Sequence, residues 1–139
     1  MTVEEVKSYL GRAFYLDKRI QCLEEEISMI ESHLYKCTPS YNNVGGSTQS
    51  TFEFTLDRLL NYRDRLNGEW DELIKAKKQI KTTIDSLSDD IQRLVLVERY
   101  INYKSYEDIA RNLGYSVRQI HNIKKQAIKN ISLNFTIEV

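Results

Sequence analysis

The chain of 139 residues has few of the residues that interrupt a helix, with one proline and five glycines. Sheet proteins need many tight turns, which draw on these two residues, so their scarcity predicts an all-α fold. No stretch approaches the ~18 consecutive apolar residues of a membrane span. The first residues include acids where a signal peptide has a basic segment and an apolar run, so we expect a cytoplasmic protein.

Cysteine and histidine are also scarce, with two of each. Cys22, His33 and Cys37 match no zinc-ligand spacing, so we expect free thiols, no bound metal and no cofactor. The sequence also lacks a glycine-rich phosphate loop and a nucleophile beside clustered carboxylates. We therefore expect that the protein is not an enzyme.

The net charge is zero, but the charges are distributed unevenly along the chain. Residues 99–131 hold seven Lys or Arg side chains against Glu107 and Asp108, which gives a local charge of +5. Residues 1–98 hold thirteen basic and seventeen acidic side chains, a charge of −4, and Glu138 adds −1. A concentration of positive charge in an otherwise acidic chain is typical of a segment that binds nucleic acid.

Apolar residues recur every seven positions through most of the first 88 residues, which predicts two long helices. The first helix, from about residue 3 to residue 35, carries Val6, Ala13, Ile20, Ile27 and Leu34 in one series and Tyr9, Leu16, Leu23 and Ile30 in the other. The second carries Phe52, Leu59, Leu66, Leu73, Ile80 and Leu87 with Leu56, Trp70 and Ile84. Residues 37–51, between the helices, are rich in Ser, Thr, Asn and Gly and predict a polar loop.

We expect the two long helices to form an antiparallel, coiled-coil-like hairpin over residues 1–88. Leu60, Tyr62 and Ile74 lie beside the seam, where a single helix pair leaves them uncovered. A second copy of the chain would cover them, so we expect a homodimer that forms through the hairpin. At the seam, Lys77 either specifies the register of the pair or extends its ammonium group to solvent.

The last third of the chain has shorter segments with clear helix start and stop residues. Ser105, followed three positions later by Asp108, forms a capping box that starts a helix. Gly114 ends this helix, since the residue after a helix often takes a positive φ, and Ser116 caps the next helix from about Val117. Two helices joined by a turn of about three residues are typical of a helix-turn-helix.

The second of these helices has two different faces. Ile120, Ile123, Ala127 and Ile131 fall on one side at the helical period, and the opposite side is basic and rich in amides. Such a face suits the major groove of double-stranded DNA, where Arg pairs with guanine and Asn with adenine. The predicted DNA-contacting residues are Ser116, Val117, Arg118, Gln119, His121, Asn122, Lys124, Lys125 and Lys129.

The helix-turn-helix and the tail after it form the predicted C-terminal domain, residues 89–139. The tail, residues 132–139, alternates apolar and polar residues like a short strand. Alternatively, the tail packs Phe135 and Ile137 against the preceding helices. The sequence leaves both alternatives open.

Residues 89–131 resemble the C-terminal promoter-binding region, region four, of bacterial sigma factors. The matching segments are Leu96-x-x-Arg99-Tyr100-Ile101, Ser105–Ala110, Leu113–Ser116 and Gln126–Lys129. By position, the resemblance implies that Val117, Arg118, His121 and Asn122 contact promoter DNA, with Val117 in the place of a usually polar residue. It also implies RNA polymerase as a partner, because region four contacts the polymerase.

The whole chain resembles a family of small phage and prophage proteins of Gram-positive bacteria, in which long helices precede the same helix-turn-helix. The segments Arg99–Ala110 and Gly114–His121 carry this resemblance. Related proteins of the ArpU and RinA types are regarded as late-gene transcriptional activators, so the resemblance implies a transcriptional regulator that binds DNA of phage or prophage genes. The alternative is a DNA-packaging protein of the small-terminase type, although such proteins usually place the DNA-binding part first.

Overall fold

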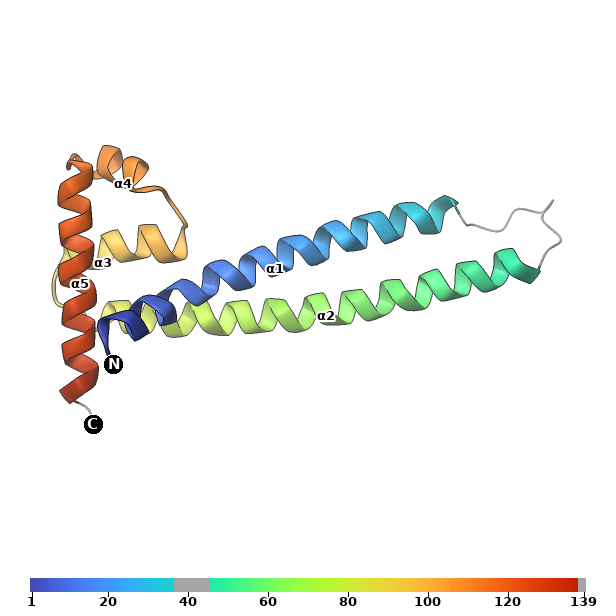
Figure 1. Cartoon of the computed structure of the whole chain (residues 1–139), viewed down its shortest axis with the longest axis horizontal. Helices are drawn as coiled ribbons and strands as arrows, with labels where there is room; N and C mark the ends of the chain where they lie inside the picture. Colours follow the sequence, from blue (N-terminus) through green and yellow to red (C-terminus); the bar gives the residue numbers. More distant parts are fainter. Residues whose placement is uncertain (37–45, 138–139) are drawn as a thin grey trace. The chain divides into compact units, whose positions relative to one another are not determined.

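A computed structural model describes residues 1–36 and 46–137, apart from the side chains of residues 46–49 and 136–137. Helices joined by short turns make up these residues, with no β-strand among them, which confirms the predicted all-α class. The elements are α1 (Val3–Lys36), α2 (Gly46–Asp85), α3 (Asp90–Leu96), the π-type helix η1 (Val97–Ile101), α4 (Tyr106–Leu113) and α5 (Val117–Ile137) (Figure 1). Within the part described, no helix is long and apolar enough to cross a membrane.

The chain forms two compact units. One consists of Met1–Tyr15 together with Leu73–Val139, and the other consists of Leu16–Glu72. The start of α1 and the end of α2 therefore belong with the C-terminal helices, whereas the sequence placed a boundary between residues 88 and 89. Tyr103 contacts both long helices, and these contacts account for the difference between the predicted boundary and the observed units.

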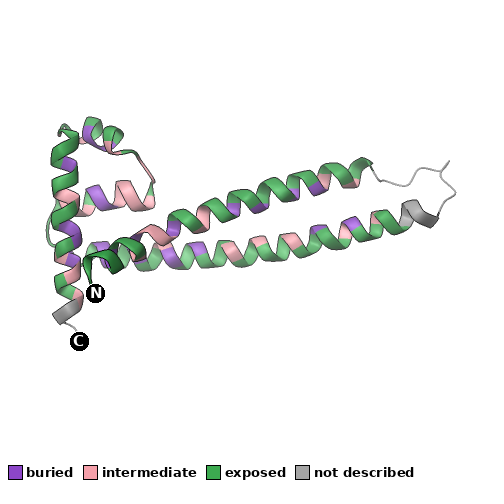
Figure 2. Cartoon of the chain, viewed as in Figure 1, coloured by how far each residue is buried: buried purple, intermediate pink, exposed green. Residues whose placement is uncertain are grey.

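In the unit Leu16–Glu72, α1 packs antiparallel against α2. Arg19 forms an ion pair with Glu69, and Glu31 accepts a hydrogen bond from Arg63 at 2.7 Å, so the two helices run in opposite directions. The side chains between them are Ile27, Ile30 and Leu59, all buried, with Leu34, Tyr62 and Leu66 packed against these three. Figure 2 shows buried positions, in purple, at intervals along both long helices. The side chains at the heptad positions predicted for this part of the seam are buried or half-buried, except that of Trp70, which is 39% exposed. Tyr62 contributes to the seam instead of lying uncovered beside it.

Helix α2 begins earlier than the sequence predicted. A polar loop was expected over residues 37–51, but α2 starts at Gly46 and already includes Thr51. Once the heptad residues from Phe52 onward have formed the helix, each residue added in front gains a backbone hydrogen bond at little further cost. The rest of the predicted loop, with Cys37, lies outside the described residues.

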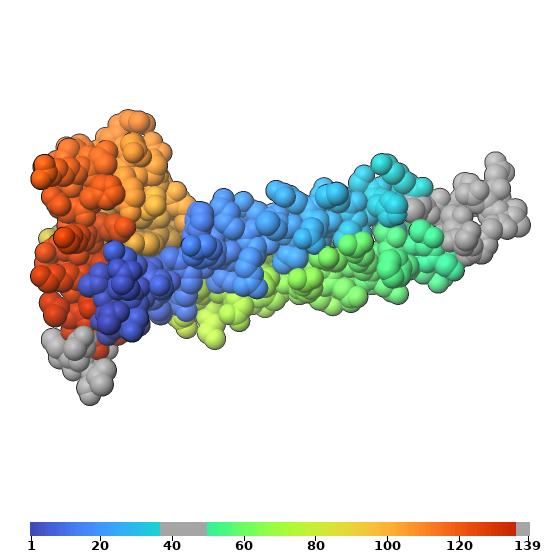
Figure 3. Space-filling view, in the orientation of Figure 1, coloured from blue at the N-terminus to red at the C-terminus, as the bar shows by residue number. Residues whose placement is uncertain are grey.

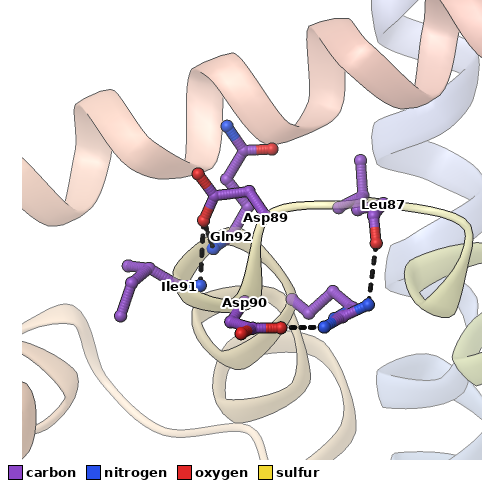
Figure 4. A network of polar contacts seen from close by, with 6 residues as sticks. Leu87, Asp89, Asp90, Ile91 and Gln92 are labelled. Atoms are coloured by element: carbon purple, nitrogen blue, oxygen red, sulfur yellow. Dashed lines mark hydrogen bonds and ion pairs between the residues drawn. The ribbon is translucent and has the colours of Figure 1, made fainter.

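A short turn connects α2 to α3 and is held by polar contacts (Figure 4). The Asp89 carboxylate accepts hydrogen bonds from the backbone N–H groups of Ile91 at 2.9 Å and Gln92 at 3.1 Å, which caps α3. Arg93 reaches back from α3 and donates to the backbone carbonyl of Leu87 at 3.0 Å. Together these contacts fix the direction in which α3 leaves the end of α2.

The π-type helix η1 leads into a residue with a strained backbone. The N–H of Asn102 donates to the carbonyl of Val97, five residues back, at 3.1 Å. Tyr103 follows with a φ of 57°, a left-handed conformation that costs a residue other than glycine about 1 kcal/mol. The Tyr103 side chain offsets this cost, because its hydroxyl donates to the Ala13 carbonyl at 3.2 Å and the Lys77 Nζ lies 5.1 Å from its ring centroid. Tyr103 thereby connects α1 and α2 to the C-terminal helices, and Lys77 finds an aromatic partner.

Helix α5 continues through the tail of the chain to Ile137. The strand alternative is therefore wrong for residues 132–137, because neither glycine nor proline follows Val117 to interrupt the helix. Ile131 is fully buried and Phe135, about one turn later, is half-buried, so the helix keeps an inner side along the tail. The side chain of Ile137 lies outside the described residues.

Gly114→Ala should lower the free energy of unfolding by about 1 kcal/mol, because Gly114 has a φ of 74° that strains any residue with a Cβ. Gly11→Ala is the matched control, since Gly11 lies inside α1 and an added Cβ meets no atom within 4 Å at either position. Alanine forms helices better than glycine by about 1 kcal/mol, so this variant should be more stable than the wild type. Urea unfolding followed by circular dichroism tests both variants, and shifts of the same sign would contradict the backbone argument.

Candidate nucleic-acid interface

A tight turn joins α4 to α5, and capping contacts fix both of its ends. At the start of α4, Ser105 Oγ accepts a hydrogen bond from the N–H of Asp108 at 3.2 Å. At the end of α4, Gly114 is left-handed and the Tyr115 N–H returns to the carbonyl of Ala110 at 3.0 Å. The start and stop residues predicted for α4 are thus confirmed.

Ser116 and Gln119 close the start of α5 through reciprocal hydrogen bonds. Ser116 Oγ accepts the N–H of Gln119 at 3.1 Å, and Gln119 Oε1 accepts the N–H of Ser116 at 2.8 Å. Both residues were predicted to contact DNA, and both are exposed. Their side-chain oxygens are already engaged in the cap, so their first role is to position α5, while the amide NH2 group of Gln119 takes no part in the cap.

One side of α5 is buried against α3 and α4. Ile120, Ala127 and Ile131 have no exposed surface, as their spacing predicted. The core cluster at the first turn of α5 consists of Ile120, Val95, Ile109 and Ala110. Burial of this side fixes which residues of α5 face outward, because a helix cannot turn about its axis without exposing these side chains.

The opposite side of α5 is exposed and basic. Arg118, Asn122, Lys125 and Lys129 are all exposed, and Val117 retains 36% of its surface at the start of the helix. No acidic residue occurs in α5, so nothing within the helix neutralises its four Lys and Arg side chains. A face of this kind attracts phosphate groups and repels other cations.

Tyr106, the first residue of α4, brings three side chains together around its ring. The Arg99 guanidinium lies 4.2 Å from the ring centroid, and the His121 ring packs against it with 4.1 Å between centroids. Lys124 Nζ donates to the Tyr106 hydroxyl at 2.5 Å. His121 and Lys124 were predicted to contact DNA, and the structure gives each of them a partner within the protein. They are therefore held in fixed positions beside the exposed face of α5.

Two residues of α1 lie near this face, and no sequence pattern predicted their position there. Val3 and Lys7 line a cavity of about 290 Å³ whose other walls are His121, Asn122, Lys124, Lys125 and Ile128 of α5. These residues come from opposite ends of the chain, and a helical period relates only residues within one helix. The sequence alone therefore could not join them.

The π-type helix carries a half-buried tyrosine, Tyr100, and a charged hydrogen-bonded group, Glu98. Burial raises the pKa of Tyr100 to about 12, and the neighbouring Tyr106 adds to the shift, so Tyr100 stays a neutral phenol. The pKa of Glu98 lies below its ordinary value, because its carboxylate accepts hydrogen bonds from Lys104 Nζ at 2.5 Å and Asn102 Nδ2 at 2.8 Å. These bonds close the turn that leads from η1 to α4.

The exposed groups of this region that a partner can contact are cations and amides. Among the residues that the structure describes, no group of three His, Cys, Asp or Glu side chains is placed to hold a metal ion. Cys22 is a free and exposed thiol on α1. The exposed face of α5 thus presents positive charge and amide groups.

Residues 15–133 match the model of one protein family, DUF722, described as a protein of unknown function. The match covers most of the chain, so the chain belongs to this family. No curated protein and no solved structure matches the chain.

Glu98→Gln should lower the free energy of unfolding by about 1 kcal/mol at neutral pH, because the charged bonds to Lys104 and Asn102 become weaker. The pKa of Glu98 is depressed in the folded state, so its stabilising contribution is present above the ordinary value of 4.5 and is lost as the pH falls through the folded-state pKa. The two proteins should therefore become equally stable in acid. Thermal unfolding at neutral and at acidic pH measures this, and a difference that persists in acid would contradict the proposed role of the charge.

Proposed function

We propose that this member of the DUF722 family is a sequence-specific DNA-binding regulator of transcription, with α4 and α5 as a helix-turn-helix and α5 as the recognition helix. The observation that carries the proposal is the exposed face of α5, where Arg118, Asn122, Lys125 and Lys129 offer positive charge and an amide with no acidic neighbour in the helix. A helix whose other side is buried presents such a face in one fixed orientation. That is the arrangement which the major groove of DNA accepts.

The residues of this face differ in what they can recognise. Arg118 and Asn122 lie about one turn apart near the start of α5, the part of a recognition helix that reaches base edges. Arg donates two hydrogen bonds to guanine, and Asn both donates to and accepts from adenine, so both distinguish bases. Lys125 and Lys129 follow on later turns and suit backbone phosphates, which need charge more than geometry.

The resemblances support promoters as the place of action. The likeness of residues 89–131 to region four of sigma factors favours promoter DNA as the ligand of α5 and RNA polymerase as a second partner. The likeness of the whole chain to small phage proteins favours phage or prophage genes as the targets. Double-stranded promoter DNA is accordingly the ligand to test.

Arg118→Ala and Asn122→Ala should each reduce discrimination between DNA sequences by about 1–3 kcal/mol, because each removes a base contact. Lys129→Ala should instead weaken binding to all sequences alike, because a phosphate contact carries no sequence information. The probes are the duplex enriched by the wild-type protein from a randomised library and an unenriched random duplex. Fluorescence anisotropy with both duplexes gives the affinity ratio for each variant.

Salt dependence provides a second measurement on the same duplexes. If about six phosphates are neutralised, the affinity should fall with salt with a log–log slope of about −5. The proposal fails if the wild type binds neither duplex. It also fails if Arg118→Ala and Asn122→Ala retain the full affinity ratio while circular dichroism shows an intact fold.

We also propose that the protein forms a homodimer through one side of α2. Leu60 and Ile74 are 50% and 62% exposed and lie fourteen positions apart, so they recur on the same side of a helix with a seven-residue period. Ile20 and Ile27 are buried within the single chain, so their side chains are not available for contact with a second copy. A second copy would cover the exposed side of α2 and would place two recognition helices on one DNA molecule.

Leu60→Lys combined with Ile74→Lys should dissociate the dimer, because two charges would be buried at the interface. DNA affinity should then fall, since the second half-site would no longer be bound as an intramolecular event. Asn61→Lys is the matched control, because Asn61 is exposed on a different side of α2. Sedimentation equilibrium measures the mass, and a wild-type protein with the mass of one chain at micromolar concentration would contradict the dimer.

A further inference from the structure

The first two turns of α1 lie beside the exposed face of α5, within one compact unit. Figure 3 shows the first residues of α1, in dark blue, packed against α5, in red. Ser132 Oγ donates a hydrogen bond to the carbonyl of Met1 at 2.5 Å, and Val3 and Ile128 both line the cavity between the two helices. Val6 and Leu10 have no exposed surface, so the start of α1 is held by apolar packing as well.

Three lysines line this cavity, and no carboxylate does. Lys7 comes from α1, and Lys124 and Lys125 come from α5. Lys124 is held in place by its hydrogen bond to Tyr106, while Lys7 and Lys125 are exposed. An anion that entered this cavity would therefore meet positive charge and no carboxylate among the residues that line it.

Of the two acidic residues at the start of α1, Glu5 is engaged in a helix cap and Glu4 forms an exposed ion pair with Lys7. Glu5 closes a cap with Thr2, in which Glu5 Oε2 accepts the Thr2 N–H at 3.3 Å and Thr2 Oγ1 accepts the Glu5 N–H at 3.2 Å. Glu4 lies 3.6 Å from Lys7 Nζ, but both side chains are exposed, and exposed ion pairs of this kind contribute little stability. Lys7 can therefore exchange Glu4 for another anion at small cost.

We infer that Lys7 binds a backbone phosphate of DNA, and that the start of α1 forms one wall of the DNA-binding surface. The inference rests on the proposed function of α5. A recognition helix in the major groove has a phosphate strand on each flank, and the cavity lies on the flank of α5 next to Asn122. The N-terminal helix would thus contribute to affinity without contributing to sequence discrimination.

The test compares Lys7→Ala, Lys7→Arg and Lys36→Ala with the wild type, using the enriched and the random duplex. Lys7→Ala should weaken binding to both duplexes by about fivefold at ~0.15 M salt and make the log–log salt slope smaller by about 0.9, which is the effect of one lost phosphate contact. Lys7→Arg should retain the wild-type slope. Lys36→Ala, an exposed lysine at the other end of α1, is the control for a general loss of charge.

Glu4→Gln provides a change in the opposite direction. Removing this carboxylate frees Lys7 and should raise the affinity for both duplexes. The inference is overturned if Lys7→Ala binds like the wild type, or if Lys36→Ala has the same effect as Lys7→Ala. If Arg118→Ala still loses discrimination in that case, the proposed function of α5 stands and only the role of Lys7 is lost.

A phosphate buffer distinguishes DNA from free phosphate as the anion in this cavity. At matched ionic strength, replacing chloride by inorganic phosphate should leave the difference between wild type and Lys7→Ala unchanged. A cavity that binds inorganic phosphate in the wild type, together with a Lys7→Ala variant that binds both duplexes like the wild type in chloride, would assign the cavity to the free ion and overturn the assignment to DNA. A wild type that binds no duplex would overturn this inference together with the proposed function.

Discussion

The burial of one side of α5 is the constraint on which the rest of the molecule depends. Ile120, Ala127 and Ile131 are completely removed from water. Burying an isoleucine side chain stabilises a fold by roughly 1.5–3 kcal/mol, so these contacts hold α5 in a single rotation about its axis. The polar residues of the other side contribute little to that packing. These residues can therefore differ in identity without disturbing the core, and the proposed role of Arg118 and Asn122 depends on this independence.

Tyr106 extends the same constraint to charged groups. Its ring contacts Arg99 and His121, and its hydroxyl accepts a hydrogen bond from Lys124, so side chains of η1, α4 and α5 meet at one residue. A lysine or arginine that is already held in place loses less conformational entropy when it meets a ligand. Tyr100, kept neutral by burial, adds no negative charge to this neighbourhood. Of the basic side chains of α5, Lys124 is thus held in place by contacts within the protein.

The C-terminal helices do not form a unit by themselves. Tyr103 adopts a left-handed backbone conformation. Its side chain donates a hydrogen bond to the Ala13 carbonyl of α1 and contacts Lys77 of α2. Strain of this kind persists only where surrounding contacts hold it. The start of α1 and the end of α2 therefore belong to the same compact unit as α5. Within this unit, the start of α1 lies beside Lys125 and Asn122.

The sequence by itself determined the helical class, the α1–α2 seam, the capping residues Ser105 and Gly114, and the division of α5 into an apolar and a basic side. Each of these follows from residues that lie within one helix or one turn, where a period or a cap is visible in the order of residues. Only the tertiary structure decided that Lys7 lies beside Lys125, that Tyr103 contacts Ala13, and that His121 packs on Tyr106. Such contacts join separate elements of the chain, and no local period relates them. They depend on how whole helices pack, which is set by the sum of many small burial terms that no short motif records.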